Sequence, residues 1–409
     1  MLTPHPTLRR SDLFSGCRND LRALGDGDSL YLTYNARGAL YQLLQAIPEN
    51  KGSVVLLPAF HCTALVEPVA HSRFRAAFYR IKPDLSIDYD DLRSKATSDV
   101  AVIVAIHFFG FPADLSPLLE LRQQLGCYLL EDCAHSFLTV DGGRPIGHRG
   151  DFSIFSFYKT VPSLFGGALR INHKPFQFTP SSNSISWKES AVISKRLFEQ
   201  IIENSSDGFG KRSYQSLENR RLSRKKSAPA ADQPSASNFV DDPYLFRADL
   251  AKARIPWSCR SILRSSDWQA FVAARRRNYA LLNVALKKNN VLSKVFTCLP
   301  EGVCPWAYPV LLQDRTQHDQ ELRARGVPLF TFGEVLHPLL AQSDSSVRKD
   351  AEDLSNRLML LPVHQNLSVD DVTQYADEIN RFLAGFEPNP VESHATAAAP
   401  RPLTSRGCL

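Results

Sequence analysis

The chain has 409 residues, of which 44% are hydrophobic and 22% are charged, a balance typical of soluble globular proteins. This length exceeds one ordinary domain, so we expect a large domain and a smaller one. No apolar run reaches the ~18 residues of a transmembrane helix, and the first ten residues lack the apolar core of a signal peptide. The composition also excludes collagen, a coiled coil and a wholly disordered chain.

The net charge of +6 arises in one polar segment, because residues 211–226 carry seven basic side chains and a single acid, Glu218. We interpret this segment as a solvated surface loop rather than a basic flap over an anionic substrate. The rest of the chain is nearly neutral, which argues against nucleic acid as a partner. Eight cysteines without a CxxC pair argue against a disulfide scaffold or a zinc ribbon. They predict free thiols in a reducing cytoplasm and no metal site.

Strand and helix signals alternate from residue 28 to residue 172. Near-continuous apolar runs such as Val100–Ile106 are typical of parallel strands buried on both faces. Apolar residues recur at helical spacing from Leu40 to Ile47, and again from Leu115 to Leu121 before Gly126. This alternation predicts an α/β fold with helices on both sides of a sheet. The expected strands are residues 53–57, 74–81, 100–106, 127–130, 152–157 and 168–171.

Residues 174–243 interrupt this rhythm and predict a polar, partly disordered insertion, clearest at 227–238, with a short helix near 191–202. Helical character returns from 246 to 286. A smaller α+β unit follows, with a strand at 307–312, a helix at 317–325, an apolar stretch at 358–361 and a closing helix at 369–383. The expected division is an N-terminal segment (1–28), a large domain (29–290), a small C-terminal domain (291–385) and a disordered tail (386–409).

Several polar features fall where a doubly wound sheet brings the carboxyl ends of its strands together. Asn35 and two small-residue positions, Ala36 and Gly38, precede the first helix, so its free N–H groups are available to an anion. Taken alone, a plain helix cap is the more probable interpretation. Asp132 and His135 directly follow an expected strand, although a histidine there is as often a surface or core residue.

Lys159 follows an apolar, aromatic strand, which is unusual because lysine is rarely buried without a partner. Desolvation lowers the pKa of such an amine and makes it available as a nucleophile. The alternative is a strand-end lysine that extends to solvent. Gly166 and Gly167 come soon after it and allow close approach of the backbone to a ligand.

Together these motifs resemble the DegT/StrS-type sugar aminotransferases, pyridoxal-phosphate enzymes of the aspartate-aminotransferase fold type I, from roughly Leu30 to Leu383. The resemblance implies an α/β large domain with a mostly parallel sheet, a smaller α+β C-terminal domain and a homodimer. The matching motifs are Asn35-Ala36-Arg37-Gly38-Ala39-Leu40, Leu57-Pro58-Ala59-Phe60-His61, Ile106-His107-Phe108-Phe109-Gly110, Glu131-Asp132-Cys133-Ala134-His135, Phe155-Ser156-Phe157 with Lys159, Gly166-Gly167, and Leu360-Leu361-Pro362-Val363-His364-Gln365.

The resemblance also implies roles for single residues. Lys159 matches the Schiff-base lysine that also acts as acid and base, and Asp132 matches the carboxylate that pairs with the pyridine nitrogen. His135 matches the position near the phenolic oxygen of the ring. The expected phosphate contacts are Ser156 and the backbone of Ala36 and Arg37, and the residue stacked on the ring is expected to be His61, although the family often has its aromatic residue at the position of Cys62.

The sequence departs from the family pattern in three respects, and these departures bear on the identity of the substrate. The step from Ser156 to Lys159 is shorter than in better-known members, and Leu164-Phe165 stands where an acid often precedes the paired glycines. The Asn and Arg that the family offers across the dimer are not recognisable, and Arg254 is a poor candidate.

The expected activity is transfer of an amino group from an amino acid, expected to be glutamate, to a keto group, most plausibly of a nucleotide-linked sugar used for polysaccharide or a secondary metabolite. Pyridoxal 5'-phosphate is the expected cofactor. The alternatives are a sugar dehydratase on the same fold, in which a histidine replaces the lysine, and a non-catalytic regulator that binds the same cofactor. We expect a cytoplasmic enzyme without a membrane or nucleic-acid partner.

Overall fold

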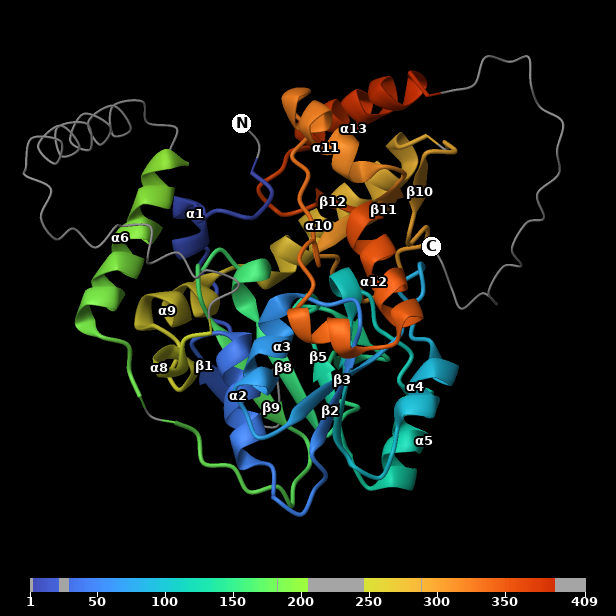
Figure 1. Ribbon diagram of the computed structural model, residues 1–409. Coiled ribbons are helices and arrows are strands. Elements are labelled where there is room, and N and C mark those ends of the chain that lie inside the picture. Colours follow the sequence, from blue (N-terminus) through green and yellow to red (C-terminus); the bar gives the residue numbers. More distant parts are fainter. Residues whose placement is uncertain (1–2, 22–28, 182, 205–245, 288, 387–409) are drawn as a thin grey trace, which may run out of the picture.

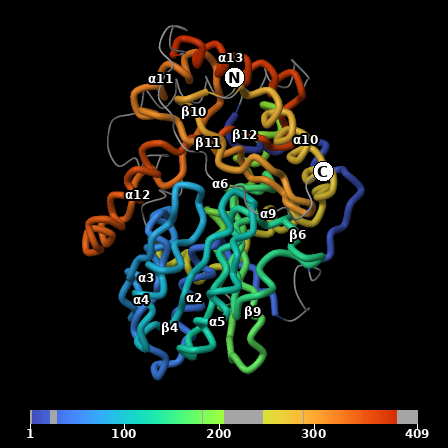
Figure 2. The backbone as a smooth tube through the Cα atoms, turned by 90° about the vertical axis from the view of Figure 1, so that its right-hand side faces the viewer, coloured from blue at the N-terminus to red at the C-terminus, as the bar shows by residue number. Residues whose placement is uncertain are grey.

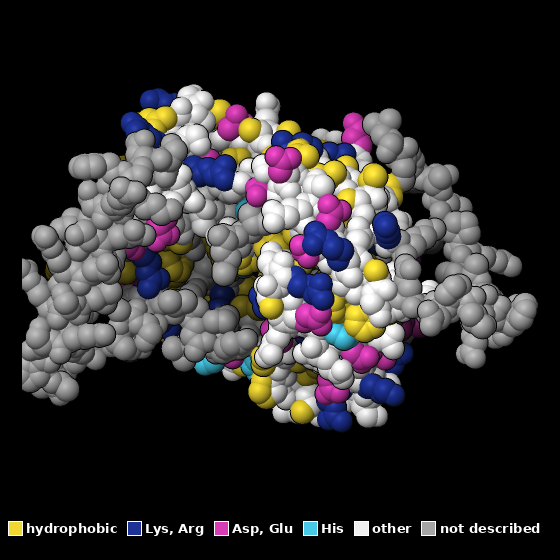
Figure 3. Space-filling view, turned by 90° about the horizontal axis from the view of Figure 1, so that it is seen from above, with side chains coloured by type: hydrophobic (Ala, Val, Ile, Leu, Met, Phe, Trp, Pro, Cys, Tyr) yellow, Lys and Arg dark blue, Asp and Glu magenta, His cyan; other side chains and the backbone are white. Residues whose placement is uncertain are grey.

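The structure is a computed structural model and describes residues 3–21, 29–181, 183–204, 246–287 and 289–386 (Figure 1). Among these residues, no helix combines the length and the hydropathy needed to cross a bilayer. The disorder expected at 227–238 and in the tail, and the basic segment 211–226, lie outside the described residues. On the face seen in Figure 3, the described lysine and arginine side chains are interspersed with acidic ones.

A seven-stranded sheet forms the larger unit. Five of its strands pair in parallel, and β9 is antiparallel to both β8 and β1. The mostly parallel α/β sheet expected from the sequence is thus confirmed, and β4 is buried along its whole length. In spatial order the strands are β1 (Leu30–Thr33), β9 (Gly167–Ile171), β8 (Phe152–Ser156), β5 (Tyr128–Asp132), β4 (Val100–Ile106), β2 (Val54–Pro58) and β3 (Arg75–Tyr79).

Helices connect these strands, and local sequence signals set several of their ends. Asn35 caps α2, since its side-chain oxygen accepts a hydrogen bond from the Gly38 N–H at 2.8 Å. Gly126 ends α5 in the left-handed conformation, with φ 64°. Helix α2 packs against α3 and against β9 of the sheet. The helices are α2 (Ala36–Ala46), α3 (Thr63–Ala70), α4 (Tyr89–Lys95) and α5 (Ser116–Leu125), with short 3-10 turns at η3 (Phe108–Gly110) and η4 (Phe157–Lys159) and a hairpin of β6 (Val140–Asp141) and β7 (Arg144–Pro145).

A second, antiparallel sheet lies beyond one end of the large sheet, as Figure 2 shows. Its strands are β10 (Leu292–Lys294), β11 (Ala307–Leu312) and β12 (Leu358–Pro362). Helices α10 and α13 pack together beside it and enclose a separate apolar core that includes Tyr308 and Leu361. Its helices are α10 (Trp268–Ala285), α11 (Arg315–Ala324), α12 (Ser345–Arg357) and α13 (Val369–Ala384), with the short turn η6 (Pro338–Gln342).

The helical character expected from 246 to 286 is confirmed and consists of three helices. Pro256 lies at the start of α9, and Asp267 caps α10 by accepting a hydrogen bond from the Ala270 N–H at 2.9 Å. The helix expected near 191–202 is longer than predicted because a capping box of Ser186 and Glu189 starts it earlier. The remaining helices are α1 (Arg10–Leu13), α6 (Trp187–Glu203), α8 (Ala248–Ala251) and α9 (Trp257–Ser265).

The cysteines largely follow the expectation of free thiols. Six of those described are free, at positions 17, 62, 127, 133, 259 and 304. Cys298 is disulfide-bonded and departs from it.

Candidate active site

A cavity opens at the carboxyl ends of three neighbouring strands. Ile106, Asp132 and Ser156, which are the last residues of β4, β5 and β8, all line it. The first turn of α2 forms a second wall, and Trp306 with residues 330–335 closes the side toward the second sheet. The parallel strands therefore bring together side chains that are far apart in the sequence.

Asp132 is buried at the end of β5, with 8% of its surface exposed. One carboxylate oxygen accepts a hydrogen bond from the Ala134 N–H at 2.9 Å, and the other has no partner among the described residues. Burial raises the pKa of Asp132, and the positive charge of Lys159 partly opposes that shift. The site therefore holds a desolvated carboxylate with one oxygen available to a cationic or N–H donor.

Lys159 lies on η4, directly after β8. Its Nζ is 4.9 Å from the centre of the Trp306 ring, and no hydrogen bond or ion pair to another described residue accompanies that contact. Burial lowers the pKa of Lys159, while Cys62 and Asp132 act in the opposite direction. A lysine with a lowered pKa and no fixed partner can present a neutral amine to a carbonyl group.

His135 packs against two aromatic rings that also contact each other. It stacks on Trp306 at 4.2 Å between ring centres and on Phe109 at 5.3 Å. Its Nδ1 accepts a long hydrogen bond, 3.5 Å, from the Phe109 N–H, which leaves the proton on Nε2. Burial lowers the pKa of His135 well below its usual value, so the ring is neutral and offers one N–H donor to the cavity.

The first turn of α2 approaches the cavity, and Ala36 and Arg37 both line it. Gly167 makes this approach possible. A Cβ at that position would lie 2.4 Å from the carbonyl carbon of Asn35 and 2.5 Å from the nitrogen of Ala36. With Ser156 beside it, the helix end offers N–H donors and a hydroxyl, which suits a phosphate group.

We expect Gly167→Ala to separate α2 from β9, because the new methyl group meets rigid backbone rather than a flexible side chain. Overpacking of this kind costs about 1–3 kcal/mol of folding free energy. Urea denaturation followed by circular dichroism would measure the loss. Gly385→Ala is the matched control, since its Cβ would meet only Phe382 O at 3.4 Å. Equal stability of the two variants would contradict the assigned role of Gly167.

The expected ring contact of His61 does not fit the structure. His61 is fully buried and does not line the cavity, because its Nδ1 donates to the Pro58 carbonyl at 3.0 Å and its Nε2 accepts from the His337 N–H at 3.4 Å. The residue after it, Cys62, does line the cavity. Arg254 lies outside as well, on another groove.

Arg275 connects the lysine to the second sheet and was not expected from the sequence. It is a fully buried guanidinium that donates to the carbonyls of Lys159 and Thr160, each at 3.3 Å. The same side chain donates to the Trp306 carbonyl at 3.2 Å and to Gln365 Oε1 at 3.1 Å. Arg275 therefore fixes the backbone that carries Lys159 relative to the tryptophan beneath it.

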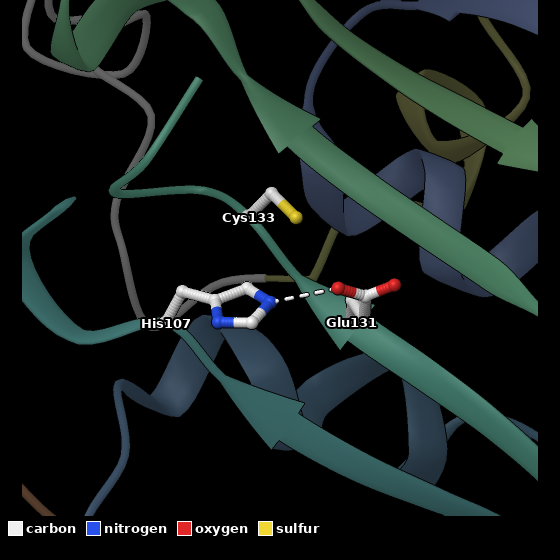
Figure 4. A group of neighbouring side chains, drawn as sticks. All are labelled: His107, Glu131 and Cys133. Atoms are coloured by element: carbon white, nitrogen blue, oxygen red, sulfur yellow. Dashed lines mark hydrogen bonds and ion pairs between the residues drawn. The ribbon is translucent and has the colours of Figure 1, made fainter. Parts of the chain in front are cut away.

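His107, Glu131 and Cys133 lie together (Figure 4), and none of the three lines the cavity. His107 Nε2 donates to Glu131 at 2.9 Å, and its Nδ1 accepts from the Ala113 N–H. The other carboxylate oxygen of Glu131 accepts from the N–H groups of Arg149 and Gly150. Burial raises the pKa of the Cys133 thiol well above its usual value, so the thiol stays protonated. The hydrogen bonds of His107 and Glu131 therefore connect the ends of β4 and β5 and fix the neighbouring Asp132.

Residues 29–173 match the model of the DegT/DnrJ/EryC1/StrS aminotransferase family, which confirms over that segment the resemblance inferred from the motifs. GDP-perosamine synthase of Vibrio cholerae is 30% identical over 141 residues, which cover 34% of this chain and 38% of that protein. A UDP-N-acetyl-3-dehydro-alpha-D-glucosamine 3-aminotransferase of Acidithiobacillus ferrooxidans is 28% identical over 129 residues, 29% of this chain and 33% of that protein. The matches thus span less than two-fifths of these relatives.

The fold similarity extends further than the sequence similarity. The structure of Helicobacter pylori PseC, an aminotransferase involved in pseudoaminic acid biosynthesis, superposes with a TM-score of 0.64 over 94% of this chain and 99% of that chain, at 15% identity. This coverage includes both sheets and confirms the fold type I architecture for the chain.

Proposed function

We propose that the protein is a pyridoxal-phosphate-dependent aminotransferase that moves an amino group from an amino acid, with glutamate as the donor, to a keto group of a nucleotide-linked sugar. The observation that carries this proposal is the pair Asp132 and Lys159. Both line one cavity, and each keeps a polar atom without a partner among the described residues. Such groups point to a ligand that the cavity is built to hold.

The residues of the cavity fit pyridoxal 5'-phosphate. The free oxygen of Asp132 would pair with the pyridine nitrogen, and the Nε2–H of His135 would donate to the phenolic oxygen. The first turn of α2 and Ser156 would hold the phosphate. Lys159 would attach the cofactor through its aldehyde. Among the described residues, Asp132, His135 and Lys159 form no ion pair that the cofactor would have to break.

When bound, the cofactor supplies an electron sink for the pair of electrons left at the donor's Cα. The chain's own residues do the rest. Asp132 holds the proton on the pyridine nitrogen, since a carboxylate beside that atom favours its charged form. Lys159, with its lowered pKa, would accept the proton from Cα and deliver it to the carbon on the other side of the amino nitrogen, which is a 1,3-proton shift. Arg275 holds the backbone of Lys159 in place while the side-chain amine moves.

The choice of acceptor rests on the relatives, whose printed names include a perosamine synthase and a 3-aminotransferase of a UDP-linked sugar. We place the reaction in the cytoplasm, which the six free thiols support. A homodimer is also part of the proposal. It is supported by a groove in which Trp257 and Phe14 are 80% and 75% exposed, because exposed aromatic side chains are typical of interfaces.

The experiment is a pair of half-reactions with the purified protein loaded with pyridoxal phosphate. Glutamate alone should convert the visible absorption band of the cofactor to that of the amine form and release 2-oxoglutarate. A panel of nucleotide-linked keto sugars should then restore the band and gain an amino group, detected by mass. If no amino acid changes the spectrum, the aminotransferase assignment is wrong.

A further inference from the structure

The N-terminal segment reaches the cavity although it belongs to neither sheet. His5 lines the cavity together with Lys159, Trp306 and Phe330. Its ring lies 4.9 Å from the centre of Phe330, edge to face, and 6.4 Å from Trp306 in a nearly parallel orientation. Residues near the start of the chain thus form one wall of the site.

This wall is fixed by backbone hydrogen bonds on both sides of His5. The carbonyl of Thr3 accepts from His364 Nε2 at 2.9 Å, and the carbonyl of Thr7 accepts from the Asn366 side chain at 2.9 Å. One residue further on, Leu8 N–H donates to Gln200 of α6 at 3.0 Å, and its carbonyl accepts from Asn204 at 3.0 Å. The segment is therefore tied both to the loop after β12 and to α6.

The imidazole of His5 has no comparable attachment. Neither ring nitrogen makes a hydrogen bond to another described residue, and His5 lines the cavity although the residue as a whole is exposed. Desolvation of the imidazole and the positive charges of Lys159 and Arg275 lower the pKa of His5 to about 4. At neutral pH the ring therefore carries one N–H donor and one acceptor nitrogen. The backbone on both sides of His5 is fixed, while both ring nitrogens lack a hydrogen-bond partner among the described residues. A neutral imidazole of this kind can form a hydrogen bond with a hydroxyl group of a ligand.

We propose that His5 is a specificity-determining residue that hydrogen-bonds a ring hydroxyl of the acceptor sugar. The proposal rests on the function given above. The cofactor would occupy the part of the cavity between Asp132 and Lys159, and the acceptor's keto carbon has to lie beside Lys159 for the amine to reach it. The sugar ring would then extend from Lys159 toward the N-terminal wall, where His5 is the polar side chain that this wall contributes.

The test compares His5→Ala, His5→Gln and His148→Ala, the last being a histidine that does not line the cavity. Loss of one hydrogen bond to an uncharged group corresponds to about a fivefold change. We expect His5→Ala to lower kcat/KM for the keto-sugar nucleotide about fivefold. The glutamate half-reaction should stay within about twofold of the unmodified protein. His5→Gln should recover part of the loss, because the amide can donate and accept. His148→Ala should change neither rate.

The outcomes separate the two proposals. If the unmodified protein aminates keto-sugar nucleotides and His5→Ala does so equally well, the role of His5 is overturned while the function stands. An equal loss in both half-reactions also overturns it, because that pattern indicates a general change in the cavity. If the unmodified protein reacts with glutamate but aminates no keto-sugar nucleotide, the acceptor assignment fails and the ligand proposed for His5 fails with it.

Discussion

Lys159→Ala is expected to abolish amino-group transfer, with a fall in kcat of at least about 10³-fold. The reason is that one side chain supplies both the attachment of the cofactor and the base that removes the Cα proton. Lys159 is the lysine that lines the cavity, and its pKa is lowered by burial. The visible absorption band of the loaded protein should disappear together with the activity.

Two further variants make this prediction sharper. Lys159→Arg keeps the positive charge but cannot present a neutral amine near pH 7, so it should be as inactive as the alanine variant. Lys174→Ala changes an exposed lysine outside the cavity and should leave both the band and the rate unchanged. Retention of turnover in Lys159→Arg would show that charge, rather than a nucleophilic amine, is what position 159 contributes.

We expect Asp132→Asn to reduce activity about 10²-fold while leaving the fold intact. The amide oxygen of asparagine can still accept the hydrogen bond from the Ala134 N–H, so the local turn is preserved. What is lost is the anionic oxygen in a desolvated site, and a hydrogen bond to a charged group contributes roughly 1.5–3 kcal/mol. The affinity for pyridoxal phosphate should fall as well.

The cofactor's dissociation constant, measured by fluorescence titration, and the rate of the glutamate half-reaction test this prediction. Asp141→Asn removes a charge from the hairpin outside the cavity and serves as the control. If Asp132→Asn transfers amino groups at the rate of the unmodified protein, Asp132 does not face the pyridine nitrogen.

Much of the large sheet could be predicted from the sequence because its strands are buried on both faces. Val100–Ile106 was predicted with the bounds that β4 has, since an unbroken run of β-branched and small apolar residues has few other interpretations. Strand β1 has no such run. Its first three residues are only half-buried, and it is identified by its pairing with β9 rather than by its own composition. Helix α12 is mostly polar and was missed for the same reason.

In the cavity, too, some residues could be predicted from the sequence and others could not. Asp132, His135, Ser156 and Lys159 follow strands directly, so the topology of a parallel sheet predicts that they meet. Trp306 directly precedes β11 of the second sheet, and no local pattern connects it to Lys159. For His61 the motif predicted a position near the cavity but not the direction of the side chain, which depends on the backbone between Pro58 and α3.

The division of the chain into domains remains a proposal. We propose a boundary near residue 290, between α10 and β10, where the chain enters the second sheet. Residues of β11 and β12 divide between two apolar cores, since Ala307 and Leu360 belong to the core of the large sheet and Tyr308 and Leu361 to the second core. Arg275 and the N-terminal segment cross that boundary through their hydrogen bonds. A movement of the second sheet would therefore change the wall of the cavity that holds His5 and Trp306.

Reduction of the loaded protein with borohydride, followed by peptide mass spectrometry, tests the central claim most directly, because it locates the covalent attachment of the cofactor in the intact chain. We predict one pyridoxal-phosphate adduct, on the peptide that contains Lys159. An adduct on a different lysine, or none after saturation with the cofactor, would contradict the assignment of this cavity as the active site.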